Sequence, residues 1–229
     1  IAYFVDAYEK KELPHFFKAS AILALAAVVG VCVNISNLYH TYEYSKETMR
    51  GKSELKQEGP AANQTSSGLD RDYITNWSYG IGETLTLLVP NVKGGGCSTT
   101  LSQNETAMAK ANPMYGNLYS QLTPYFGDQP WTAGPVYVGA FVVFLFILGC
   151  FIVKGPLKWA LLGATIFSIL LSWGKNFMGL TDFFIDYIPM YNKFRTVEMA
   201  LVIPGMVFPI IAIWGLKEIV SGKVDDALF

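Results

Sequence analysis

Four long apolar segments constrain this chain more than any other feature. A helix needs about 20 mostly apolar residues to cross the hydrocarbon core of a membrane. Segments of roughly that length occupy residues 19–39, 135–153, 157–173 and 197–216. They predict an all-α integral membrane protein with four transmembrane helices and a long, partly helical extracytoplasmic loop. Pro204 and Pro209 predict a kink in the last helix.

The composition agrees with a membrane protein and argues against other classes. Of the 229 residues, 52% are hydrophobic and 15% are charged, whereas soluble domains carry about 25% charged residues. The net charge of −1 gives no reason to expect a nucleic-acid partner. Three cysteines without a CxxC pair, and two histidines, are too few for a zinc or redox site. Because the chain does not begin with Met, we expect it to be an internal section of a longer protein.

Basic residues in the short flanks predict the orientation, since Lys and Arg gather on the cytoplasmic side. The turn KGPLK, with Lys154 and Lys158, is short and basic. The resulting division is a cytoplasmic juxtamembrane segment (1–18), a transmembrane helix (19–39), an extracytoplasmic loop region (40–134), a transmembrane helix (135–153), a cytoplasmic turn (154–156), a transmembrane helix (157–173), an extracytoplasmic interfacial segment (174–196), a transmembrane helix (197–216) and a cytoplasmic tail (217–229). This orientation leaves Lys175, Lys193 and Arg195 outside, which requires an explanation.

The interfacial segment 174–196 combines acids, bases and aromatic residues. Asp182 and Asp186 are four residues apart, so a helix would place both carboxyl groups on one face. Carboxylates beside cations at a membrane surface suit chemistry on a phosphate-bearing lipid: the cations hold the phosphate, and a carboxylate deprotonates an acceptor hydroxyl. The alternative is a surface salt-bridge cluster that anchors the segment.

Three further carboxyl groups are catalytic candidates. Asp70 and Asp72, in the sequence DRD, look like the acidic pair that binds a divalent metal in many sugar-transferring enzymes, and a divalent cation stays open as a cofactor. Equally, they suit the start of a helix. Glu83 enters an apolar run, where it is either a general base or an acid in the first turn of a helix. Glu198, at the outer end of the last segment, is a functional candidate or a partner for Arg195.

Several long stretches resemble the YfhO-like bacterial membrane proteins, especially their Bacteroidetes branch. They are NISNLYHTYEYSKETMRGKSEL, DRDYITNWSYGIGETLTLLVPNVKGG, GPVYVGAFVVFLFILG and LSWGKNFMGLTDFFIDYIPMYNKFRTVEM. The resemblance implies a fold similar to the C-type membrane glycosyltransferases, which lie in the bacterial inner membrane. These enzymes pass a sugar from a polyprenyl-phosphate donor to an acceptor on the outer side, here an envelope glycan or lipid. It also implies a lipid phosphate at the level of Lys175, Lys193 and Arg195.

Two other functions stay open from the sequence. A lipid or polymer transporter or flippase would favour ionisable groups and broken helices within the membrane. A non-enzymatic envelope scaffold would use the mixed polarity of residues 40–134 to bind partners.

Overall fold

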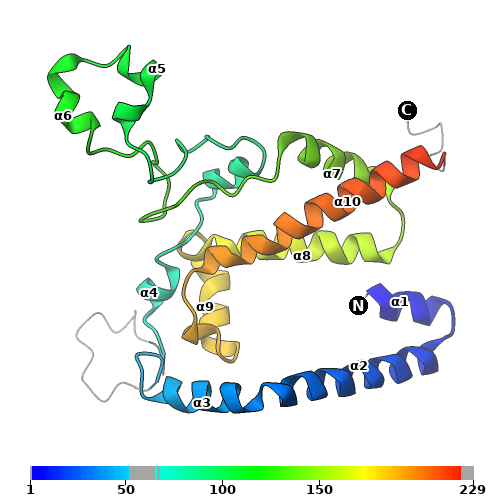
Figure 1. Ribbon diagram of the computed structural model, residues 1–229. Coiled ribbons are helices and arrows are strands. Elements are labelled where there is room, and N and C mark those ends of the chain that lie inside the picture. The colour runs from blue at the N-terminus through cyan, green and yellow to red at the C-terminus, as the bar shows by residue number, and fades with distance from the viewer. Residues whose placement is uncertain (1, 52–64, 66–67, 223–229) are drawn as a thin grey trace.

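The computed structural model describes residues 2–51, 65 and 68–222, and that part of the chain is helical without strands (Figure 1). Two of its helices, Leu13–Val33 and Val197–Val220, are long and apolar enough to cross a membrane, and a bent pair, Pro156–Ser172 with Gly174–Tyr187, raises the number to three if it counts as one span. The protein is therefore a helical protein with the features of an integral membrane protein.

The longer helices lie toward the two ends of the described chain, with short helices and 3₁₀ turns between them. In order, they are α1 (Ala2–Glu9), α2 (Leu13–Val33), α3 (Ile35–Lys46), α4 (Arg71–Thr75), the 3₁₀ turns η2 (Gly82–Leu87) and η3 (Leu101–Gln103), α5 (Glu105–Met108), η4 (Pro113–Tyr115), α6 (Gly116–Tyr119), α7 (Ala140–Ile152), α8 (Pro156–Ser172), η5 (Gly174–Phe177), α9 (Met178–Tyr187), η6 (Tyr191–Lys193), η7 (Val197–Leu201) and α10 (Val202–Val220).

Small residues let α7 and α10 approach each other closely. A Cβ atom on Gly149 would lie 2.6 Å from the carbonyl oxygen of Ile211, and one on Gly215 would lie 2.7 Å from the Cα of Gly149. The rings of Phe146 and Phe208 stack beside this contact with centroids 4.1 Å apart. Close backbone approach at small residues is how membrane helices gain packing energy, so this pair forms the centre of the helical layer.

Helix α8 packs against the same layer through small polar residues. Thr165, Ser168 and Ser172 are buried, and their hydroxyl groups donate to carbonyl groups of their own helix. Because these hydroxyl groups are satisfied within the helix, α8 presents a smooth, small-residue face to η7 and α10.

Helix α2 has no buried side chain along its 21 residues. Its apolar side chains are exposed around the whole helix, for example Leu23 at 71% and Val33 at 79%. Such a surface is costly in water and suits hydrocarbon. After a break at Asn34, the more polar helix α3 continues the direction of α2 toward α4 and α9 (Figure 1).

The helix bounds correct the four predicted segments. The first helix begins at residue 13 and breaks at Asn34, inside the predicted 19–39. The predicted 135–153 is helical only over Ala140–Ile152, about 20 Å against the roughly 30 Å of hydrocarbon, because Gly139 turns the chain with φ 110°. The predicted 157–173 matches α8, but the chain then bends by 110° into η5 and α9. The last helix extends beyond the predicted 197–216 and stays helical through Pro209.

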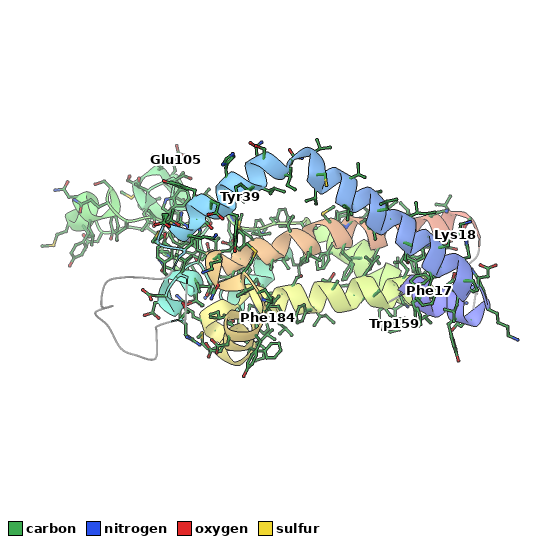
Figure 2. The ribbon with its side chains drawn as sticks, turned by 90° about the horizontal axis from the view of Figure 1, so that it is seen from below. Phe17, Lys18, Tyr39, Glu105, Trp159 and Phe184 are labelled. Atoms are coloured by element: carbon green, nitrogen blue, oxygen red, sulfur yellow. The ribbon has the colours of Figure 1, made fainter. Side chains whose placement is uncertain are left out.

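The connections gather at two opposite ends of the helical layer. The α1–α2 join, the α7–α8 turn and the end of α10 lie at one end, and α4, α9 and the segments around η2 lie at the other (Figure 1). Figure 2 shows Lys18 and Trp159 near the first end and Phe184 toward the second. Lys158 belongs to the first end, where its Nζ donates to the carbonyl of Cys150 (2.9 Å). The basic flanks that the sequence assigns to one side therefore share one end.

Candidate functional site

An arginine with two acidic partners joins parts of the chain that are far apart in sequence. Arg71, on α4, donates from Nε to Oδ1 of Asp182 (3.0 Å) and from Nη2 to Oδ1 of Asp186 (2.6 Å). The hydrogen bond to Asp182 is the main reason that the pKa of the guanidinium is raised, and the charge of Asp186 adds to it. The arginine side chain is only 18% exposed. This cluster fastens α4 to α9.

The predicted common face of Asp182 and Asp186 is confirmed, because both carboxyl groups contact the same guanidinium. Their partner is Arg71, which the sequence did not single out, although it stands inside DRD. The ion pairs match the alternative interpretation, an anchoring cluster. The catalytic role of the two aspartates stays a prediction. Beneath the cluster, Leu69, Ile74 and Ile185 form a small apolar core.

The three predicted phosphate ligands have separate partners. Lys175 donates from Nζ to the carbonyl of Asp128 (2.9 Å). Lys193 donates to the carbonyl of Arg50 (2.5 Å), and the Arg50 side chain donates back to the carbonyl of Lys193 (2.8 Å).

Arg195 donates to the hydroxyl of Tyr73 (2.9 Å) and lies over the rings of Tyr73 and Trp77. The three predicted cations thus occupy the same end of the molecule, but each is engaged by a different part of the chain. Their role as phosphate ligands stays a prediction.

Asp70 and Asp72 lie at the start of α4 and are exposed. Asp70 precedes the helix with an extended backbone and Asp72 falls in its first turn, which is the helix-start alternative drawn from the sequence. Within residues 2–51, 65 and 68–222, no group of three or more His, Cys, Asp or Glu side chains is arranged to hold a metal ion.

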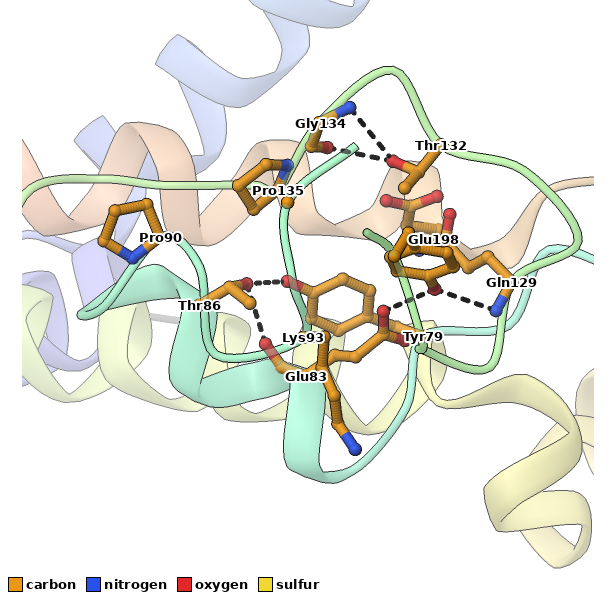
Figure 3. A pocket seen from close by; sticks show the side chains of 12 residues that line it. Tyr79, Glu83, Thr86, Pro90, Lys93, Gln129, Thr132, Gly134, Pro135 and Glu198 are labelled. Atoms are coloured by element: carbon orange, nitrogen blue, oxygen red, sulfur yellow. Dashed lines mark hydrogen bonds between the residues drawn. The ribbon is translucent and has the colours of Figure 1, made fainter. Parts of the chain in front are cut away.

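Glu83 differs from the other candidates because it is buried, with 3% of its surface exposed. It stands in the first turn of η2. Its carboxyl group accepts hydrogen bonds from the backbone N–H of Gly80 (2.6 Å), the hydroxyl of Tyr125 (2.5 Å) and, at 3.4 Å, the backbone N–H of Asp128. Three donors from two separate segments therefore converge on one carboxyl group, and Figure 3 shows Glu83 in the pocket.

Two glycines allow the backbone to approach this carboxyl group. A Cβ on Gly127 would lie 2.0 Å from Oε1 of Glu83, and one on Gly80 would lie 2.9 Å from Oε2. Real Cβ atoms do not come closer than about 3 Å to such atoms. A larger residue at either position would displace the carboxyl group.

A pocket surrounds Glu83 and brings a second carboxyl group to the same place. Figure 3 shows Glu198, at the start of the last span, on the opposite side of the pocket. Gln129, which is 7% exposed, lines the same pocket as Glu198. Its backbone N–H donates to the hydroxyl of Tyr125 (3.0 Å). Tyr125 thus joins Glu83 to the backbone of Gln129, and Glu198 lines the same pocket.

The tyrosines of the pocket are hydrogen-bond donors at neutral pH. Burial raises the pKa of Tyr79 to about 12, and the charges of Glu83 and Glu198 add to the effect. Burial and the hydrogen bond to Glu83 also raise the pKa of Tyr125. The hydroxyl of Tyr79 bonds to Thr86, which itself donates to the carbonyl of Glu83 (2.7 Å).

The pocket is built onto the ends of α8 and α10. The backbone N–H of Tyr79 donates to the carbonyl of Ser172 (2.8 Å), the side chain of Asn176 donates to the carbonyl of Tyr79 (3.0 Å), and Trp173 donates to Thr84 (3.0 Å). Gly174 makes this contact possible, because a Cβ there would lie 2.1 Å from the hydroxyl of Ser78. These contacts consequently hold Glu83 near the ends of α8 and α10.

The sequence identified Glu83 and Glu198 as candidates but did not predict that both line one pocket. Tyr125, Gln129 and Lys93 also line the pocket, and no sequence pattern gave them a role. The only signal in the sequence was the glycine-rich, aromatic composition of residues 123–134, which suits a close-packed connection.

Comparisons of the chain with protein-family models, curated proteins and solved structures found no match. The fold and the site therefore define the class: a helical protein with two or three candidate membrane-spanning helices and a buried, two-carboxyl pocket at one end of them.

Proposed function

We propose that the chain belongs to an integral membrane glycosyltransferase of the bacterial inner membrane. Its donor is a sugar linked to polyprenyl phosphate, and its acceptor is a hydroxyl group of an envelope glycan or lipid on the outer side. The observation that carries the proposal is the buried carboxyl group of Glu83 at the end of the membrane-type helices, paired with Glu198 across one pocket. The likeness of four long stretches to the YfhO-like proteins supports the same class.

Glu83 is the group best placed to act as the general base. In its ionised form it takes the proton of the acceptor hydroxyl while the acceptor oxygen bonds to the anomeric carbon. The bond from that carbon to the phosphate oxygen breaks, and its electron pair leaves with the phosphate. Asp182 and Asp186 are less suited, because each forms an ion pair with the guanidinium of Arg71, whereas the three donors to Glu83 are uncharged.

The remaining polar groups have supporting roles in this reaction. The hydroxyl group of Tyr125 and the backbone N–H of Gly80 position the carboxyl group of Glu83. Lys93 supplies a cation at the pocket, and Lys175 supplies one on the neighbouring η5, where charge on the leaving phosphate would be stabilised. Glu198, facing Glu83, would accept hydrogen bonds from further sugar hydroxyls.

The test is a sugar-transfer assay on the full-length protein with a set of polyprenyl-phosphate sugars. Glu83→Gln keeps the size of the side chain but removes the base, so transfer should fall at least about 100-fold, within the usual range for losing a general base. Glu105→Gln makes the same chemical change on the exposed helix α5, away from the pocket, and should transfer at the wild-type rate. Equal rates for the two variants would rule Glu83 out as the base.

A transporter or flippase is the second candidate, and one observation favours it. Helix α8 and the η5–α9 segment are bent by 110° where the chain leaves α8, and broken helices are common at the binding sites of transporters. A vesicle assay of lipid movement across the bilayer separates the candidates, because a transferase produces a new glycosidic bond and a flippase does not.

A further inference from the structure

One connecting segment, residues 123–135, runs across the Glu83 pocket, and we name it the strap. It supplies much of the lining: Tyr125, Gln129, Thr132, Gly134 and Pro135 (Figure 3). The space left for the centre of a water molecule is about 10 Å³, roughly what one water needs. A sugar hydroxyl with its ring attached cannot reach Glu83 while the strap is in this position.

Hydrogen bonds, more than apolar packing, hold the strap in place. Its two large apolar side chains, Phe126 and Trp131, are 65% and 54% exposed. Glu83 receives two of its hydrogen bonds, from Tyr125 and from the backbone of Asp128. Further hydrogen bonds join the strap to Trp77, Lys93, Cys97, Lys175 and Asn176. A segment that buries little apolar surface opens at a lower free energy than the packed helices.

The ends of the strap differ from its middle. After the strap, the backbone N–H of Val138 donates to the carbonyl of Leu87 (3.2 Å), and Val138 packs beside a buried apolar cluster. Gly134, near that end, has open space around it. Two hydrogen bonds join Gly134 to Thr132 within the strap, so a rotation near Gly134 can leave Val138 in place.

We propose that the strap is a lid and that Glu83 is its latch. The same carboxyl oxygens that accept from Tyr125 and Asp128 are those that a ligand hydroxyl would need. A ligand that hydrogen-bonds to Glu83 competes with the strap, so it binds the open state better and shifts the population toward it. The lid controls access to the pocket, and this inference holds whether the protein transfers a sugar or transports a lipid.

Hydrogen–deuterium exchange of the full-length protein in detergent micelles tests the lid. In the wild type, strap peptides should exchange together and faster than Ala140–Ile152 and Val202–Val220. Glu83→Gln replaces one acceptor oxygen by an N–H₂ group, and exchange in the strap should rise about 100-fold. Tyr125→Phe removes the hydrogen bond to Glu83 and leaves the backbone N–H of Gln129 without this acceptor, and the rise should be about tenfold. Glu105→Gln should leave the strap unchanged.

The outcomes divide clearly. A rise confined to the strap in either variant supports the lid. If Glu83→Gln loosens the helices as well, Tyr125→Phe decides: a local rise supports the lid, and an unchanged strap overturns it. Wild-type strap exchange as slow as that of α10 also overturns it. A strap that opens in a protein without transferase activity would end the proposed function and leave the lid intact.

Discussion

Replacing Gly127 by alanine tests whether the close approach of the strap to Glu83 holds the pocket together. The added Cβ would lie 2.0 Å from Oε1 of Glu83 and 2.2 Å from the hydroxyl oxygen of Tyr125. Both atoms must move by about 1 Å or more to restore normal contact. The hydrogen bond between them, 2.5 Å long, must lengthen or break unless both side chains move together.

The structure also gives the size of the effect. A hydrogen bond to a charged group contributes about 1.5–3 kcal/mol, and the weaker bond from Asp128 is strained as well. We expect Gly127→Ala to lower the free energy of unfolding by about 2–3 kcal/mol. Gly134→Ala is the matched control, because a Cβ at this position of the same strap meets nothing within 4 Å, and its effect should stay within about 0.5 kcal/mol.

The assay is denaturant unfolding of the purified protein in mild detergent, followed by tryptophan fluorescence, with Trp131 reporting from the strap. If Gly127→Ala lowers the free energy of unfolding no more than Gly134→Ala does, the backbone near Glu83 has space for an added methyl group. The reasoning about a tightly packed latch would then be wrong.

Two further predictions concern the ion cluster and the tyrosines. Arg71→Met removes the partner of Asp182 and Asp186. It should lower the stability measured by thermal unfolding by about 1 kcal/mol, since the two acids are almost half exposed. Adding Asp182→Asn and Asp186→Asn should recover part of that loss, and a further loss of stability would contradict the ion pairs. Because folding raises the pKa of Tyr79 from 10 to about 12, the folded state holds the proton more tightly. The contribution of Tyr79 to stability should be constant below pH 10 and fall between pH 10 and about 12. The stability of Tyr79→Phe should fall less steeply over this range, and an identical slope would refute this assignment.

Much of the fold could be predicted from local patterns in the sequence. The apolar character of Leu13–Val33 and Val197–Val220 comes from consecutive residues, and so does the shared face of Asp182 and Asp186. The short α7 was not predictable in the same way, because the apolar run begins at residue 135, before the helix does. Their extended backbone depends on Gly139 and on contacts such as that of Val138 with Leu87.

The site could not be predicted from the sequence in this way, because contacts between distant segments form it. Tyr125 is 42 residues from Glu83 in the hydrogen bond that joins them, and Arg71 is 111 residues from Asp182. Single-sequence patterns of period 2 or 3.6 contain no information about such pairs. The sequence therefore identified Glu83 as ionisable in an apolar context, while its pocket became visible only in three dimensions.

The most direct test of the account is the side of the membrane on which the pocket lies. Single cysteines at Glu105 and at Lys154, in a protein whose native cysteines 32, 97 and 150 are replaced by alanine, can be labelled in intact bacterial spheroplasts with a membrane-impermeant maleimide. We predict that the cysteine at 105 is labelled at once and that the cysteine at 154 is labelled only after permeabilisation. Labelling of 154 in intact spheroplasts, or protection of 105, would contradict an outward-facing pocket on a membrane-spanning helical layer.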